Sequence, residues 1–190
     1  NIYGLLLHSC DDLLKPGGRL LFQEMERLKS IGMIQKIGVS LYDGKQVDRL
    51  LDNYPIDLVQ LPINILDQRL IKGGQLVKLK KYNVEIHARS AFLQGLLLMS
   101  LNNTPPWFNP VREVLESFHK EAKKRNMTVL QLALSFVQSI DEIDKVIVGV
   151  NTLKQLKEVV NAASIRVNTT ELSCMSIDDP VFVNPGNWKT

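Results

Sequence analysis

Cysteine is scarce in this chain of 190 residues, which contains only Cys10 and Cys174. Two isolated thiols indicate neither a disulfide framework nor a metal site, so we expect no bound metal. No apolar run approaches the roughly 18 residues that are needed to cross a bilayer, and no signal peptide is visible. These absences predict a cytoplasmic protein without a membrane partner.

Blocks of basic residues are also absent. The 23 Lys and Arg residues nearly balance the 20 Asp and Glu residues, for a net charge of +3. One cluster, Lys120 to Arg125, is typical of a solvated helix end with cations near the negative pole of the helix dipole. Nucleic acid is therefore not favoured as a partner. The hydrophobic fraction of 45% predicts one globular domain over residues 1–190.

A regular alternation of apolar runs and amphipathic stretches is present instead. Strands are predicted at 2–8, 34–40, 57–63, 84–90 and 145–150, and helices at 18–32, 45–54, 73–83, 128–139 and 153–163. The strand runs are almost continuously apolar, as in parallel strands that are covered on both faces. The sequence therefore predicts an α/β fold with five parallel strands and flanking helices, either an open doubly wound sheet or part of a TIM (β/α)8 barrel.

The loops favour the barrel. No GxGxxG turn follows the first strand, as a doubly wound dinucleotide-binding sheet would normally require. Polar side chains lie instead at the carboxyl ends of four strands: His8, Ser40, Gln60 with Asn64, and Arg89 with Ser90. Any one of them could simply make a local hydrogen bond, but in a barrel this end carries the chemistry.

The chain is short for such a barrel. A complete one needs about 250 residues and eight units, whereas five strand–helix units are counted here and no Met precedes Asn1. We therefore expect an incomplete barrel that lacks its first three units, through processing or because the chain is part of a longer one. The missing segment would then be a partner that covers the exposed sheet edge.

Several stretches, in order and spacing, resemble the aldo-keto reductase family over nearly the whole chain. MERLKSIGMIQKIGVS is similar to the family's helix 4 and strand 5, DLVQLPINIL to strand 6, and VEIHARSAFLQGLLL to strand 7. QLALSFVQS and KVIVGVNTLKQLKEVVNAA match helix 7, strand 8 and helix 8. The resemblance implies the C-terminal five-eighths of a (β/α)8 barrel that binds NADP(H), or less often NAD(H). It also implies hydride transfer between the nicotinamide and a small-molecule carbonyl or alcohol.

The resemblance assigns one catalytic residue. His8 ends NIYGLLLH, which is similar to the stretch that carries the family's catalytic His. An imidazole there could reach a substrate oxygen, although it could also bond a neighbouring carbonyl group. The family's catalytic Asp, Tyr and Lys have no counterpart here, because none of the four tyrosines, Tyr3, Tyr42, Tyr54 and Tyr82, lies at the required place. The chain by itself is therefore expected to be inactive.

The resemblance also assigns cofactor contacts. Ser40 and Gln60 would bind the nicotinamide carboxamide. Arg89 would stack under the ring, where its charge should favour the reduced cofactor. The residues beside the pyrophosphate would be Ser90, Phe92, Leu93, Gln94 and Gly95, and those at the adenosine phosphate would be Val150, Asn151, Thr152 and Gln155. Members that prefer NADP carry Arg where Gln155 stands, so the choice between the two cofactors is open. Asn151 and Thr152 could also simply cap a helix.

Other interpretations remain open. Trp107 and Phe108 could line a substrate rim or staple a helix start, Trp188 could contact substrate, and His87 and His119 are expected to be structural or solvent-facing. The alternative function is a non-catalytic nucleotide-binding or regulatory module of the same fold. An open α/β protein of unrelated function is a third possibility, against which the polar strand ends argue.

Overall fold

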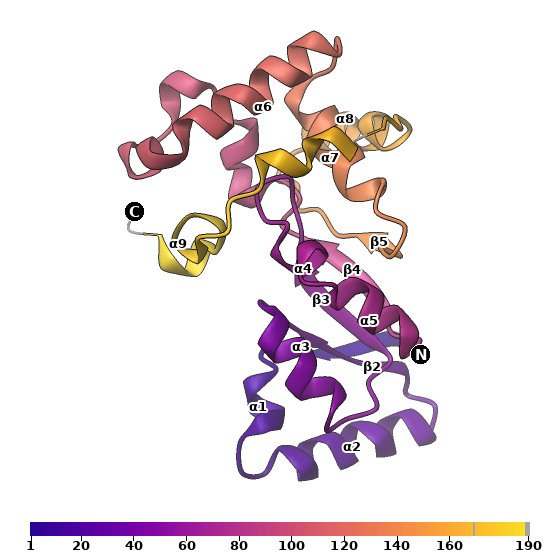
Figure 1. Cartoon of the computed structure of the whole chain (residues 1–190). Coiled ribbons are helices and arrows are strands. Elements are labelled where there is room, and N and C mark those ends of the chain that lie inside the picture. The colour runs from indigo at the N-terminus through magenta and orange to yellow at the C-terminus, as the bar shows by residue number, and fades with distance from the viewer. Residues whose placement is uncertain (169, 189–190) are drawn as a thin grey trace. The chain divides into compact units, whose positions relative to one another are not determined.

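The computed structural model describes residues 1–168 and 170–188. Five parallel strands form one sheet in the order β1-β2-β3-β4-β5, which is also their order along the chain (Figure 1). They are β1 (Ile2–Leu7), β2 (Ile34–Ser40), β3 (Leu58–Pro62), β4 (Glu85–Arg89) and β5 (Lys145–Val146). The predicted α/β fold is confirmed, and the sheet is open, with β1 and β5 at its edges.

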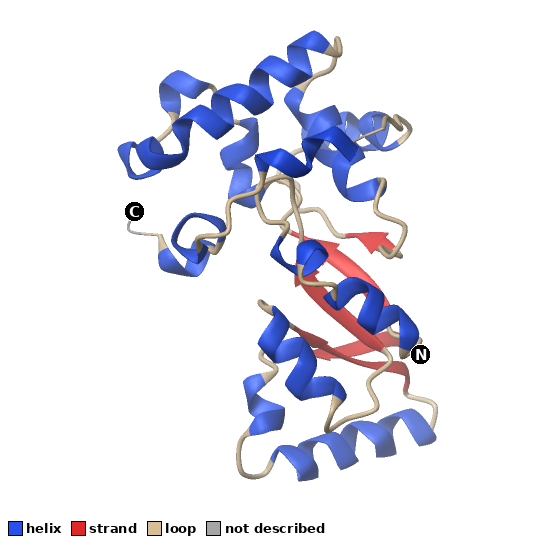
Figure 2. Ribbon diagram, in the orientation of Figure 1, coloured by secondary structure: helices blue, strands red, loops and turns tan. Residues whose placement is uncertain are grey.

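Helices connect the strands (Figure 2), as crossovers between parallel strands require. The helices α8 and α9 follow the last strand. In chain order the α-helices described are α1 (Asp11–Leu14), α2 (Gly18–Ser30), α3 (Gly44–Leu51), α4 (Arg69–Lys72), α5 (Gln75–Lys81), α6 (Arg112–Lys124), α7 (Val129–Gln138), α8 (Leu153–Ala163) and α9 (Pro180–Val183). Among the residues described, no helix combines the length and the apolar character that crossing a membrane would demand.

Helix starts coincide with polar capping residues. The Asp43 carboxylate accepts a hydrogen bond from the Gln46 N–H at 2.9 Å and caps α3. Thr128 forms a reciprocal capping box with Gln131 at the start of α7. Such caps satisfy N–H groups that the first helical turn leaves without a partner. The short polar stretches of the sequence therefore fix where these helices begin.

The chain folds into two compact units, which are described separately. Unit 1 comprises Asn1–Pro62, Arg69–Ala88 and Glu142–Lys145, and unit 2 comprises Ile63–Gln68, Arg89–Asp141 and the chain from Val146 onward. Fully buried aliphatic residues of β2, β3, α3 and α5 form the core of unit 1: Val39, Val47, Leu50, Leu58 and Leu79. The core of unit 2 includes Leu97, Phe118, Leu132 and Val137. That residues 1–190 form a single domain stays a prediction.

The two edge strands differ from the predicted pattern. Ile2 and Tyr3 of β1 are 59% and 42% exposed, and β1 lies at an edge of the sheet. β5 ends at Val146 instead of Val150, and Ile147 beyond it is 42% exposed. A continuous apolar run therefore predicted a covered strand where the structure has a short edge strand and an extended loop.

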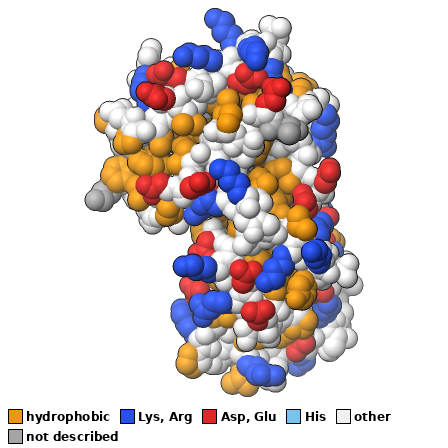
Figure 3. Space-filling view, viewed as in Figure 1, with side chains coloured by type: hydrophobic (Ala, Val, Ile, Leu, Met, Phe, Trp, Pro, Cys, Tyr) orange, Lys and Arg blue, Asp and Glu red, His pale blue; other side chains and the backbone are white. Residues whose placement is uncertain are grey.

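Two members of the basic cluster at the end of α6, Lys124 and Arg125, form ion pairs with the same carboxylate. The Arg125 guanidinium lies 2.6 Å from Glu121 Oε1, and the hydrogen bond from Arg125 lowers the pKa of that carboxyl group. Lys124 Nζ lies 3.6 Å from the same carboxylate. Over the face drawn in Figure 3, basic and acidic side chains are interspersed in the same way.

Candidate functional site

A hollow of about 600 Å³ lies within unit 2. Its walls come from the end of β4 and the loop after it, from Leu130 of α7, from the loop after β5 and from α8. The lining residues are Arg89, Ser90, Ala91, Phe92, Gln94, Gly95, Leu98, Leu130, Ile147, Val148, Gly149, Val150, Asn151, Gln155, Glu158 and Val159. The hollow thus lies where the carboxyl ends of two strands lead into loops, the usual position of ligands in parallel α/β proteins.

One wall of the hollow has an unusual backbone. Ser90, Leu93 and Gln94 have φ angles of 61°, 45° and 53°, and Gly95 follows at 87°. The left-handed region costs an L-residue roughly 1–2 kcal/mol, and such strain persists only where the surroundings hold it, often at functional sites. Hydrogen bonds from Leu93 N–H to Ser90 O and from Gly95 N–H to Phe92 O, both 2.9 Å, close these turns.

The amino end of α8 forms another part of the wall. Thr152 Oγ1 accepts a hydrogen bond from Gln155 N–H at 3.2 Å, and Gln155 Oε1 accepts one from Asn151 N–H at 2.8 Å. The capping interpretation of Thr152 is thereby confirmed. Because Asn151 and Gln155 line the hollow, the positive pole of the α8 dipole lies beside it.

The floor of the hollow is apolar. Val159 belongs to a buried cluster with Leu134 and Ala162, against which Phe92 and Val148 pack.

Two charged residues, Arg89 and Glu158, stand among the described lining residues. Glu158 Oε1 lies 4.0 Å from Lys154 Nζ, and their side chains are 51% and 87% exposed. An ion pair as exposed as this one contributes little to stability. The Glu158 carboxylate and the Lys154 ammonium group are therefore open to a ligand.

Three further predicted residues lie in unit 1, toward the carboxyl ends of their strands. Ser40 is paired in register with Gln60. His8 directly follows Leu7, whose register partner is Val39, so His8 and Ser40 are the next residues on neighbouring strands. Ser40 is 8% exposed, whereas His8 is open to solvent. The end of the sheet in unit 1 therefore carries a row of an imidazole, a hydroxyl and an amide.

The structure gathers most of the predicted cofactor residues but not all of them. Eight line the hollow of unit 2: Arg89, Ser90, Phe92, Gln94, Gly95, Val150, Asn151 and Gln155. Leu93 belongs to the same loop, but its side chain is fully buried, and Thr152 caps α8. Sequence reasoning missed Glu158, although it stands three residues after Gln155, a spacing that places both on one face of a helix. It also missed Leu130, for which the sequence offers no signal beyond an apolar position near a helix start.

A charged cluster occupies the opposite end of the sheet in unit 1. Glu85 accepts hydrogen bonds from Tyr3 Oη at 2.6 Å, from Lys145 Nζ at 2.7 Å and from Lys36, and His87 Nε2 lies 2.6 Å away. Burial raises the pKa of the Glu85 carboxyl group, but the four hydrogen bonds together lower that pKa well below its usual range. Tyr3, Glu85 and Lys145 stand at the amino ends of their strands, so this Tyr–Lys grouping lies away from the row that contains His8.

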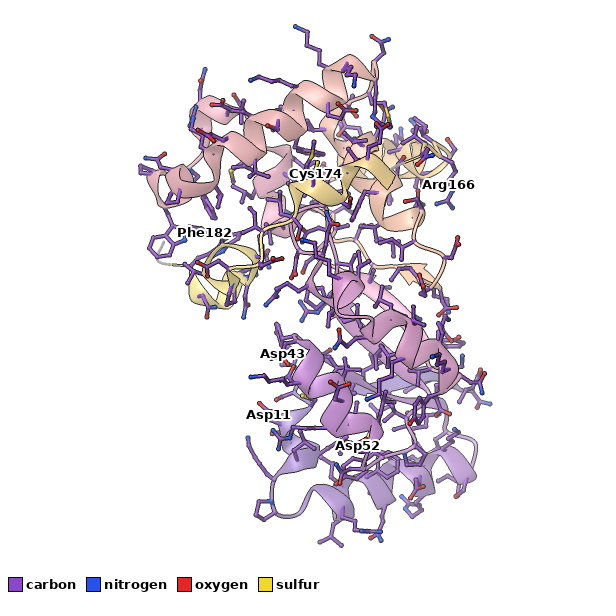
Figure 4. The ribbon with its side chains drawn as sticks, viewed as in Figure 1. Asp11, Asp43, Asp52, Arg166, Cys174 and Phe182 are labelled. Atoms are coloured by element: carbon purple, nitrogen blue, oxygen red, sulfur yellow. The ribbon has the colours of Figure 1, made fainter. Side chains whose placement is uncertain are left out.

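Aromatic residues fasten the C-terminal segment within unit 2. Phe108 is buried and meets Trp188 edge to face, with ring centroids 4.9 Å apart. Trp188 Nε1 donates a hydrogen bond to the carbonyl oxygen of Phe182, which lies on α9 in Figure 4. Packing is thus a sufficient role for Phe108 and Trp188 in the structure. His87 is buried beside Glu85, and His119 packs against Phe118, where burial lowers its pKa.

Comparison with known proteins gives a consistent result. The profile of the aldo/keto reductase family matches residues 5–177. An NADH-specific methylglyoxal reductase of Escherichia coli strain K12 is 22% identical over 165 residues, which are 80% of this chain and 50% of that protein. The chain therefore spans about half the length of this relative.

Solved structures share the fold at low sequence identity. An aldo-keto reductase from Bacillus halodurans superposes with a TM-score of 0.71 at 21% identity, over 92% of this chain and 60% of that one. A glycerol dehydrogenase from Gluconobacter oxydans does so with a TM-score of 0.62 at 22% identity, over 85% of this chain and 54% of that one. The open sheet of five parallel strands thus matches part of these larger proteins.

Proposed function

The chain belongs to the aldo/keto reductase family, and from this premise we propose that the full-length protein reduces a small carbonyl compound with a nicotinamide dinucleotide. The family resemblance predicted from the residues is confirmed, and it implies NAD(P)H-dependent oxidoreduction. In this proposal the chain contributes the hollow of unit 2, which holds the cofactor. It also contributes the strand-end row of unit 1, in which His8 meets the substrate.

The strained wall of the hollow is the observation that carries the proposal. Leu93, Gln94 and Gly95 have positive φ in succession, which coils the loop tightly beside the hollow, and because Gly95 carries no side chain, an anion such as a phosphate group can approach the backbone closely. The amino end of α8 adds an anion-attracting element. The apolar floor suits a flat ring, and about 600 Å³ is within the usual size of a small-molecule site.

Each group has a role that its chemistry permits. The loop of residues 90–95 would hold the pyrophosphate, and the residues around Asn151 the adenosine phosphate. Ser40 and Gln60 would hydrogen-bond the carboxamide of the nicotinamide, which supplies the hydride when it is bound. His8, at an exposed strand end, would hydrogen-bond the carbonyl oxygen, orient it and share in its proton transfer.

Gly95→Val tests whether the loop binds the cofactor. Gly95 has φ 87°, and an added Cβ would meet no atom of the protein within 4 Å, so within the protein the substitution acts through the backbone. A β-branched residue is strained there, and the loop must move. We expect the Kd for NADH, measured by fluorescence titration of the full-length protein, to rise about tenfold, since strain of roughly 1–2 kcal/mol corresponds to a factor of that size.

Gly32→Val is the matched control. Gly32 follows α2 in unit 1 with φ 74°, also with open space around its Cβ position, and it does not line the hollow. We expect the Gly32→Val variant to lose as much stability as Gly95→Val and to bind NADH with the Kd of the unsubstituted protein. If the two substitutions raise the Kd equally, the loop of residues 90–95 is not part of the cofactor site.

We further propose that NADH is preferred over NADPH. Glu158 lines the hollow, and a carboxylate can bond a ribose hydroxyl but repels a 2′-phosphate. Gln155 carries no charge, and its side-chain oxygen is bound to Asn151 N–H. The NADH specificity in the name of the Escherichia coli relative agrees with this reading.

Gln155→Arg should shift the preference toward NADPH. A guanidinium at this position of the hollow can pair with a 2′-phosphate, and charge-assisted pairs of this kind are strong. The ratio of the Kd for NADPH to that for NADH should fall about tenfold, as one new charged hydrogen bond of ~1.5 kcal/mol predicts. Asn161→Arg adds the same charge to α8 outside the hollow and should change the ratio less than about twofold. Equal shifts in the two variants would mean that the effect is only long-range charge.

The carbonyl substrate is proposed by analogy. The name of the Escherichia coli relative makes methylglyoxal the first compound to test. Consumption of NADH by the full-length protein with methylglyoxal, followed at 340 nm, would support a small dicarbonyl substrate. Saturable NADH binding without turnover of any carbonyl tested would favour the alternative of a regulatory module.

A further inference from the structure

The turn that follows β3 contains an unusual concentration of buried polar side chains. Asn64, Asp67 and Gln68 are 0%, 1% and 2% exposed, and all three belong to the segment Ile63–Gln68 of unit 2. Buried polar groups are retained where hydrogen bonds satisfy them. The partners of these groups therefore show what the turn holds in place.

Asn64 uses both ends of its amide. Oδ1 accepts hydrogen bonds from Leu66 N–H at 3.0 Å and from Asp67 N–H at 2.9 Å, which closes the turn on itself. Nδ2 donates to the carbonyl oxygen of Ser90 at 3.2 Å. Two N–H groups converge on one atom, so that atom must be the amide oxygen, and the nitrogen must face Ser90.

Ser90 is the first left-handed residue of the strained wall, with φ 61°, and it lines the hollow. Its carbonyl oxygen also receives the Leu93 N–H at 2.9 Å, and the preceding carbonyl, that of Arg89, receives Ile63 N–H at 3.1 Å. The turn after β3 thus fastens both peptide groups at which the chain leaves β4. Without these hydrogen bonds, Ser90 would relax to negative φ, which is lower in energy for an L-residue.

From these contacts we propose that Asn64 is a positioning residue for the dinucleotide. Its amide holds Ser90 in the left-handed conformation and so shapes the wall of residues 89–95 before the cofactor arrives. Asn64 does not line the hollow, so it acts through Ser90 and not by contact. This inference rests on the proposed function, because it takes the hollow to be the cofactor site.

Asn64→Asp separates the two jobs of the side chain. The carboxylate keeps an oxygen for the N–H groups of Leu66 and Asp67, but it has no donor and turns an oxygen toward the Ser90 carbonyl. We expect the Kd and the KM for NADH of the full-length protein to rise about tenfold, because a hydrogen bond is lost and an acceptor is left opposed. The kcat at saturating NADH should stay within about twofold of the unsubstituted value.

Gln68→Leu is the matched control in the same turn. Gln68 Nε2 bonds the carbonyl oxygens of Ile65 and Leu172 at 2.7 and 3.1 Å, and none of its hydrogen bonds given by the structure reaches Ser90. This variant should lose thermal stability, as Asn64→Asp does, and bind NADH within about twofold of the unsubstituted protein. If both variants weaken NADH binding in proportion to their loss of stability, Asn64 is only structural and the proposal fails.

Ser90→Gly provides a rescue. Glycine adopts positive φ without penalty, so the wall needs less support, and adding Asn64→Asp to Ser90→Gly should weaken NADH binding only about two- to threefold. A full tenfold loss in this background would contradict the proposed route through Ser90. Asn64→Ser, whose hydroxyl can close the turn but cannot reach Ser90, takes the place of Asn64→Asp if that variant does not fold.

The outcomes keep this inference distinct from the proposed function. If the unsubstituted protein does not bind NADH, the proposed function fails. If it binds NADH and Asn64→Asp binds it equally well, only the role of Asn64 fails.

Discussion

Replacing His8 by asparagine is expected to lower the kcat of the full-length protein for a carbonyl substrate about 10²- to 10³-fold, the usual contribution of a proton-handling side chain. Asparagine is similar in size and can still hydrogen-bond, but it cannot exchange a proton with the reacting oxygen. Because the His8 side chain is exposed at the end of its strand, we expect its replacement to leave folding unaffected. NADH affinity should therefore stay within about twofold of the unsubstituted value, so that the loss falls on the chemical step.

His119→Asn controls for the loss of an imidazole as such. His119 lies on α6 and packs against Phe118, away from the residues that line the hollow. Its replacement should leave kcat unchanged. A kcat for His8→Asn within twofold of the unsubstituted protein would show that His8 is an ordinary strand-end residue.

Glu85→Gln is expected to lower the free energy of unfolding by about 2 kcal/mol at pH 7. The carboxylate accepts from Lys36, Lys145 and Tyr3, and its side chain is 11% exposed. Glutamine keeps a carbonyl oxygen but lacks the negative charge that the two ammonium groups share. Breaking a fully buried pair costs about 3–5 kcal/mol, and the value here is smaller because the Lys36 and Lys145 side chains reach solvent. Urea denaturation followed by circular dichroism would measure it.

The effect should depend on pH in one direction. Because folding lowers the pKa of Glu85, its contribution is fully present above the unfolded value of about 4.3 and is lost as the pH falls further. The difference between the two proteins should be constant from pH 8 to about pH 5 and shrink below about pH 4. Asp48→Asn, which breaks the exposed pair with Lys78, should show little change throughout; an equally small effect of Glu85→Gln would contradict the cluster's structural role.

The sequence was sufficient for the order of the five strands and of five helices (α2, α3, α5, α7 and α8), but it did not delimit α6 (Arg112–Lys124) or the short helices α1, α4 and α9. Apolar runs located the strands because such a run is a local signal, and in the structure polar caps such as Asp43 and Thr128 mark where helices begin. The length of β5 was not predictable in this way. An apolar run does not reveal whether a strand has one neighbour or two, and Lys145–Val146 has one.

The candidate site was predictable where its residues follow one another along the chain. The loop of residues 90–95 and the turn at Asn151 were predicted from the family resemblance, and the cap at Thr152 from the sequence itself, but the strain of the loop was not predicted. Glu158 and Asn64 were harder to assign. Their roles depend on which groups the fold brings beside them, such as the Ser90 carbonyl 26 residues away from Asn64.

In the proposed function, the strained loop and the amino end of α8 form a dinucleotide site. The most direct measurement is a fluorescence titration of the full-length protein and its Gly95→Val variant with NADH, NADPH and NAD⁺. We expect saturable binding at one site per chain, tightest for NADH and weakened about tenfold by Gly95→Val. The absence of saturable binding, or equal binding by the two proteins, would contradict it.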